Sequence, residues 1–230
     1  MKVIFITVLL GMLVAPAVAA QRGVCAPYTE PVTLDFQTLK PAPVYNNSLN
    51  IDGIRALFRE HTGTVNGPHQ RALGVTYALT SFSLRGSTVV KQVRGGYCIY
   101  VESVEAVFGW KHMDVYIASE FQPGTCEYRT IRDHENQHVG ANNDTLKEYA
   151  PHFRAALEQA LAGQKPIFST AMPPNGDASF EVIQRRMSGY LEQFQTLMAT
   201  RNAPLDSASN YGETAKLCSN WDGVGPPKGR

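Results

Sequence analysis

The sequence predicts an α+β fold, in which an antiparallel sheet of three to five strands packs on two long helices. Two observations predict it. Residues 73–121 contain alternating, β-branched and aromatic runs that are typical of strands. Residues 126–162 and 179–199 then repeat apolar side chains at helical spacing. The chain therefore divides into a sheet part at about 65–122 and a helical part at about 125–200.

The first 20 residues have the pattern of a secretory signal peptide. Lys2 precedes an apolar run, and Ala17-Val18-Ala19 fits the small residues of a cleavage site. The alternative, an uncleaved membrane anchor, is disfavoured because the run is short and ends in Pro and small residues. We expect residues 21–230 to form a single domain that is periplasmic or extracellular.

Charge and cysteine content narrow the function classes further. Lys2 is one of 21 basic residues, so the remaining chain carries as many acidic as basic side chains. This balance favours neither nucleic acid nor an anionic membrane surface as a partner. Four cysteines behind a signal peptide indicate two disulfides. Chain order favours the pairs Cys98–Cys126 and Cys25–Cys218, and a cysteine zinc site is disfavoured because no C-x-x-C spacing occurs.

The sheet part is expected to begin with isolated elements. Residues 33–39, "TLDFQTL", alternate like a strand, and residues 51–63 resemble a short helix that stops at Gly63. Residues 74–90 read as two short strands joined by a turn at "RGS", residues 85–87. Two further runs, within 95–108 and 113–121, complete the predicted sheet.

The helical part begins after "QPGTC". Thr125 can cap a helix that starts at Cys126, with Glu127 well placed in its first turn. The helical period continues to residue 162. Gly140 and a possible second capping box at 145–148 leave open whether this is one helix or two. An amphipathic helix follows at 179–199, and the tail beyond it is irregular, with at most one helical turn.

The helix carries the most informative motif, "HENQH". His134 and His138 are four residues apart, so both imidazoles project from one face and can reach a single Zn²⁺. Glu135 is rotated by about 100° from His134, where it can take a proton from a metal-activated water. This is the physical basis of the H-E-x-x-H pattern of zinc hydrolases.

A third ligand must come from elsewhere in the chain. Asp206 in "PLDSASNYG" is the leading candidate, and Tyr211 beside it could donate its hydroxyl to a developing oxyanion. Asp144 is the second choice, and it requires a sharp turn after Val139. The other carboxylates and imidazoles that were considered lie on polar faces or too far along the helix: Glu181, Glu192 and His152.

The segments "GTCEYRTIRDHENQH" and "LDSASNYG" resemble a bacterial family of predicted secreted zinc-dependent proteases, across residues 90–215. The family has H-E-x-x-H after a strand-rich region and a later Y-D-x-x-T-x-H-G segment, onto which Asp206 and Tyr211 fall. Tyr211 stands in place of the family's His. If that His is a ligand, this chain lacks it; if the Asp is the ligand, Asp206 keeps it. The resemblance implies a zincin-like domain.

These observations predict a secreted zinc metallopeptidase that acts on a peptide or protein substrate. Zinc would be bound by His134, His138 and Asp206, and Glu135 would act as general base and then as general acid. No membrane contact is expected after signal cleavage. The alternative is a non-catalytic envelope protein that binds a metal or a peptide. The sequence does not reveal the oligomeric state.

Overall fold

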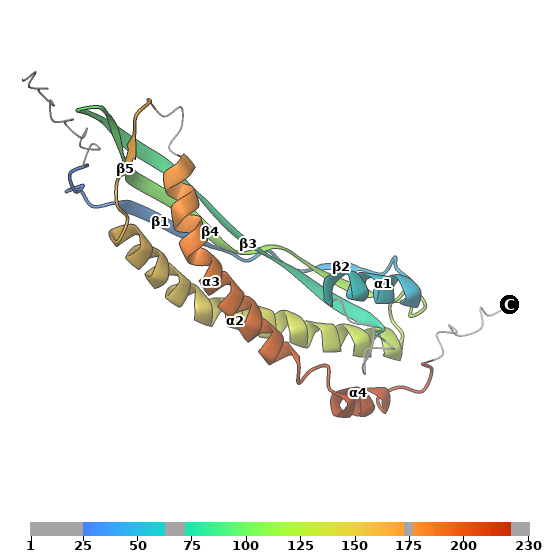
Figure 1. The fold of residues 1–230 in the computed structure, drawn as a ribbon. Helices are drawn as coiled ribbons and strands as arrows, with labels where there is room; N and C mark the ends of the chain where they lie inside the picture. Colours follow the sequence, from blue (N-terminus) through green and yellow to red (C-terminus); the bar gives the residue numbers. More distant parts are fainter. Residues whose placement is uncertain (1–24, 63–71, 173–176, 222–230) are drawn as a thin grey trace, which may run out of the picture.

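The computed structural model describes residues 25–62, 72–172 and 177–221, so the predicted signal peptide at 1–20 lies outside the described residues. A long sheet is covered on one face by two long helices (Figure 1). The elements are, in order, β1 (Thr33–Leu39), β2 (Val44–Asn46), α1 (Ile51–Thr62), β3 (Gly74–Val93), β4 (Gly96–Ile117), α2 (Cys126–Ala162), β5 (Ile167–Ser169), α3 (Asp177–Asn202) and α4 (Ala208–Ala215).

The predicted antiparallel, zincin-like sheet is wrong, because the observed sheet is mixed. β3 and β5 run antiparallel to β4, but β1 and β2 run parallel to it. The path of the chain explains this. After β1 and β2 run along one edge, the chain passes through α1 and returns as β3, and the next hairpin reverses it again into β4. The local alternation of side chains cannot reveal this order, since it is the same for both kinds of pairing.

β3 is one continuous strand, so the predicted turn at 85–87 is also wrong. Gly86 is needed for close approach rather than for turning: a Cβ atom there would lie 1.9 Å from the carbonyl oxygen of Ser103 on β4. The register shifts between Ser87 and Thr88, which marks an irregularity rather than a turn. The chain reverses after Val93 instead, where Gly95 has a φ of 84°.

The main core lies between the sheet and the helix pair. Phe108 from β4, Phe153 from α2 and Phe194 from α3 are fully buried, and the rings of Phe108 and Phe153 stack at 4.1 Å between centroids. α2 is one helix of 37 residues with Pro151 inside it. It curves along the sheet with α3 beside it (Figure 1). The sequence left open whether residues 126–162 form one helix or two, and the structure shows one continuous helix.

Replacing Phe153 with Ala should lower the free energy of unfolding by about 3–5 kcal/mol, because it opens a cavity at the centre of this aromatic cluster. Chemical denaturation followed by circular dichroism measures the change. Met172→Ala is the control: Met172 is 62% exposed, so its loss should change stability by less than about 0.5 kcal/mol. Equal effects of the two substitutions would contradict this placement of the core.

Two disulfides join the cysteines, in a pairing that differs from the predicted one. Cys25 bonds to Cys98, and Cys126 bonds to Cys218. The pairing Cys98–Cys126 and Cys25–Cys218 is therefore wrong. Cys25 precedes β1, whose parallel register with β4 places it near the start of β4. The chain after α4 returns to the first turn of α2. The sheet register therefore accounts for the first pairing, and the second disulfide fastens the chain after α4 to the start of α2.

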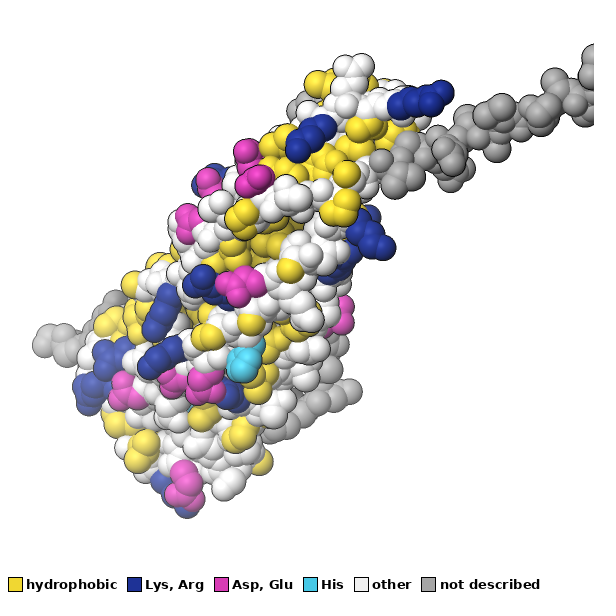
Figure 2. All heavy atoms as spheres, turned by 90° about the vertical axis from the view of Figure 1, so that its left-hand side faces the viewer, with side chains coloured by type: hydrophobic (Ala, Val, Ile, Leu, Met, Phe, Trp, Pro, Cys, Tyr) yellow, Lys and Arg dark blue, Asp and Glu magenta, His cyan; other side chains and the backbone are white. Residues whose placement is uncertain are grey.

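The disulfides are compatible with a secreted protein. Within the described residues, no helix is both long and apolar enough to cross a membrane. Basic and acidic side chains are interspersed on the face shown in Figure 2, which is the end of the molecule that carries β5 and the end of α2.

Candidate metal centre

The histidines of HENQH lie on the buried side of α2. Thr125 caps the helix by accepting a hydrogen bond from the backbone N–H of Tyr128, as predicted for a start at Cys126. From there the helical period places His134, Glu135 and His138 against the rest of the fold. Their exposed fractions are 6%, 4% and 7%. Buried polar groups need partners, so their surroundings define a site rather than a solvated helix face.

Asp206 meets the two histidines. Its Oδ1 lies 3.1 Å from Nε2 of His138 and 3.5 Å from Nε2 of His134, and the two Nε2 atoms are 3.3 Å apart. Ligands at 2.0–2.1 Å from a tetrahedral metal are separated by about 3.3 Å. The three atoms therefore already have the spacing of three corners of such a tetrahedron. Among the His, Cys, Asp and Glu side chains of the described residues, these three form the group that could hold a metal ion.

A short connection between α3 and α4 carries Asp206 to this position. α3 ends at Asn202, and Ser207 caps α4 by accepting a hydrogen bond from the backbone N–H of Asn210. From α4, Tyr211 donates its hydroxyl to Oδ1 of Asp206 at 2.7 Å. This contact orients the carboxylate. The predicted donation from Tyr211 to an oxyanion stays a prediction.

Two asparagines that the sequence analysis did not single out fix the orientation of His138. Asn202 donates from Nδ2 to Oδ1 of Asn142 at 2.8 Å and to the backbone oxygen of Met198 at 2.9 Å. Its own Oδ1 therefore faces Nδ1 of His138 at 2.7 Å, and the imidazole must donate there. Nε2 is then the atom that can offer a lone pair to a metal. By contrast, Nδ1 of His134 is buried without a hydrogen-bond partner among the described residues.

Glu135 is held against the first residues of β3. The hydroxyl of Thr76 lies 2.9 Å from Oε2 of Glu135 and 3.0 Å from its backbone oxygen. Gly74 leaves room for the carboxylate, since a Cβ atom there would lie 2.7 Å from Oε1. Burial raises the pKa of Glu135, and the positive charges of His138 and His134 oppose that rise. A carboxylate with a raised pKa is better suited to accept a proton near neutral pH than an exposed one.

Burial and mutual contacts shift the pKa values of the residues in this cluster. Burial lowers the pKa of His138, but the hydrogen bond to Asp206 and the charge of Glu135 outweigh burial and raise this pKa to about 9. Burial raises the pKa of Asp206, and hydrogen bonds from His134 and His138 more than reverse the rise, so this pKa lies well below its usual range. Burial and the bond to Asp206 raise the pKa of Tyr211, which keeps the phenol protonated. The protonated imidazole of His138 is therefore paired with the carboxylate of Asp206, and a metal ion that binds Nε2 of His138 would have to displace that proton.

The other predicted ligand candidates are not brought to this cluster. Asp144 is exposed on α2, because the helix continues through 140–144 without the turn that it would need. His152 is exposed further along the same helix, and Glu181 and Glu192 are exposed on α3. Thr76, Asn142 and Asn202 were missed because their partners are 59 to 64 residues away in the chain, where no local spacing can indicate them.

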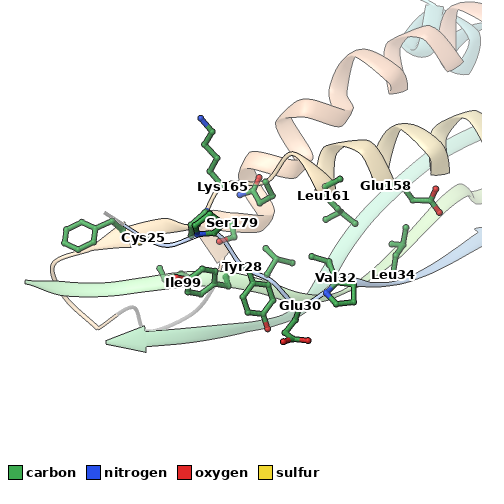
Figure 3. A pocket seen from close by; sticks show the side chains of 18 residues that line it. Cys25, Tyr28, Glu30, Val32, Leu34, Ile99, Glu158, Leu161, Lys165 and Ser179 are labelled. Carbon is green, nitrogen blue, oxygen red and sulfur yellow. The ribbon is translucent and has the colours of Figure 1, made fainter. Parts of the chain in front are cut away.

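A separate cavity of about 900 Å³ lies near the C-terminal end of α2, whereas the histidines lie nearer its N-terminal end (Figure 3). Its lining includes Tyr28, Val32, Ile99 and Leu161. Leu161 follows His138 by 23 residues, or about 35 Å along a helix. The cavity is therefore too distant to belong to the cluster of His134, His138 and Asp206.

Comparisons of this chain with protein-family models, with curated proteins and with solved structures find no match.

Proposed function

We propose that this chain is a secreted zinc-dependent metallopeptidase. The observation that carries the proposal is the convergence of His134, His138 and Asp206 at tetrahedral spacing, with the buried carboxylate of Glu135 next to them. Two imidazoles and one carboxylate form a ligand set of catalytic zinc sites, in which a fourth position stays open. A structural zinc site would instead be expected to use four protein ligands.

The donor set fits zinc better than calcium or magnesium, which prefer oxygen ligands. Bound there, zinc would supply Lewis-acid polarisation of a carbonyl group and lower the pKa of water. Glu135 would accept the proton of the attacking water and pass it to the leaving amine. Thr76 holds one oxygen of Glu135 and leaves the other free of any described hydrogen-bond donor, so the carboxylate stays oriented while it exchanges a proton.

The test is metal analysis of protein purified without a histidine tag, combined with hydrolysis of a peptide library. We expect about one zinc per chain. Hydrolysis should stop on treatment with 1,10-phenanthroline and return when zinc is added back. His138→Ala should lose both zinc and hydrolysis, whereas His112→Ala, on the sheet, should lose neither.

Two other outcomes would reject parts of the proposal. Less than about 0.3 zinc per chain after gentle purification would count against a metal centre altogether. If the chain holds zinc but cleaves no peptide, the proposed peptidase activity is rejected. The alternative function, a non-catalytic envelope protein that binds metal or peptide, is then favoured.

A further inference from the structure

α4 carries Tyr211 and follows Asp206 directly, yet it has no buried residue of its own. Apart from the contacts of Tyr211 with Asp206 and with the ring of His134, this helix therefore gains little from packing. Figure 1 shows α4 at one end of the molecule, beyond the last turn of α3. Besides its contacts with His138 and Tyr211, the position of the proposed third ligand should therefore depend on the segments at both ends of α4.

The first anchor is the end of α3. Asn202 contacts Asn142 and His138 on α2, as described above, and only three residues separate Asn202 from Asp206. This anchor fixes where the connection leaves α3. It does not fix the direction of the chain beyond residue 206.

The second anchor is the segment 217–221, which lies on the first turns of α2. Cys218 is bonded to Cys126, and its Sγ lies 3.2 Å from the hydroxyl of Thr130. The backbone N–H of Asn220 donates to Glu127 at 2.9 Å, and the indole of Trp221 packs on Phe121 at 6.1 Å between centroids. The disulfide is the one covalent bond in this anchor.

The two histidines lie on α2, and the segment that carries Asp206 is attached to the same helix through Cys218. Cys126 precedes His134 on α2 by eight residues, about 12 Å along the axis. Residues 206–218 span from the site back to that cysteine, so the disulfide closes a ring through α2, Asp206, α4 and Cys218. Opening this ring would leave that end of α4 held only by the non-covalent contacts of Asn220 and Trp221, so that Asp206 and Tyr211 would leave the histidines more often.

We propose that the Cys126–Cys218 disulfide regulates the metal centre by holding Asp206 in place, so that tight zinc binding requires its formation. The inference rests on the proposed function. A dithiol that reduces the disulfide would transfer two electrons and two protons, leave two thiols and become a disulfide itself. Asp206 would then occupy the site for only a fraction of the time, and the apparent dissociation constant for zinc rises as that fraction falls.

The experiment compares two double variants of the full mature chain. Cys126→Ser/Cys218→Ser removes the tether, and Cys25→Ser/Cys98→Ser removes the other disulfide, which joins β4 to the chain before β1. Competition with a chromophoric chelator gives the dissociation constant for zinc. We expect it to rise by about 10- to 100-fold in the first variant and to change by less than threefold in the second.

Amide hydrogen exchange of the metal-free proteins supplies a readout that does not depend on zinc. Residues 203–216 should exchange faster in Cys126→Ser/Cys218→Ser while the core residues of α2 stay protected. Equal zinc affinity and equal exchange at 203–216 in the wild type and this variant would overturn the inference and leave the metallopeptidase intact. Failure of the wild type to bind zinc would reject the proposed function instead.

Discussion

Replacing Glu135 with Gln should lower the rate of peptide hydrolysis by about a thousandfold while zinc stays bound. General acid–base catalysis contributes about 10²- to 10⁴-fold, and Gln cannot accept and return a proton. The substitution keeps the size of the side chain, and an amide oxygen can still accept the hydrogen bond from Thr76. The fold and the three proposed ligands should therefore be unchanged. Initial rates on a cleavable peptide and zinc content per chain measure the two halves of this expectation.

Asp133→Asn is the matched control for this variant. Asp133 precedes His134 on the same helix, but its side chain is 65% exposed and its described partner is Arg132 on the surface. Like Glu135→Gln, this variant replaces one carboxylate with an amide. It does so two residues away, on the surface rather than in the cluster. Hydrolysis should stay within about twofold of the wild type. If Glu135→Gln and Asp133→Asn reduced the rate equally, Glu135 could not be the proton acceptor.

The sequence predicted those parts of the site that depend on local spacing. The i, i+4 relation of His134 and His138 and the rotation of Glu135 follow from helical geometry alone, once Thr125 starts the helix. Asp206 was ranked first among the possible third ligands, and the structure places it at the two histidines. What favoured it was the elimination of the other candidates, together with the pair Tyr211-Gly212 that follows it in the sequence.

The parts that were mispredicted depend on pairing across the whole chain. "RGS" has turn residues, but Gly86 serves the close approach of β3 to Ser103, which is decided by the partner strand. The direction of β1 relative to β4 depends on the path through α1 and β3, and the same path decides which cysteines meet. Local propensity holds no information on either, because both are settled by contacts between residues far apart in sequence.

The second large effect is expected for zinc affinity when Asp206, the proposed third ligand, is replaced. Asp206→Ala should raise the dissociation constant for zinc by at least about a hundredfold, since it leaves two imidazoles to hold the metal. Loss of the carboxylate also removes the partner of Nε2 of His138 and the acceptor of the Tyr211 hydroxyl. The core between the sheet, α2 and α3 does not include Asp206, so the chain should still fold.

Asp144→Ala is the informative control, because Asp144 was the other carboxylate that the sequence offered as a third ligand. It is exposed on the continuous part of α2, six residues beyond His138. Competition with a chromophoric chelator should show unchanged zinc affinity for Asp144→Ala and weakened affinity for Asp206→Ala, with circular dichroism spectra alike for both. The opposite order would mean that α2 breaks near Gly140 when metal binds, and that a different chain geometry forms the centre. Asp206 supplies the ligand only if the histidines and the α3–α4 connection act together, and this pair of variants separates that arrangement from a site built on α2 alone.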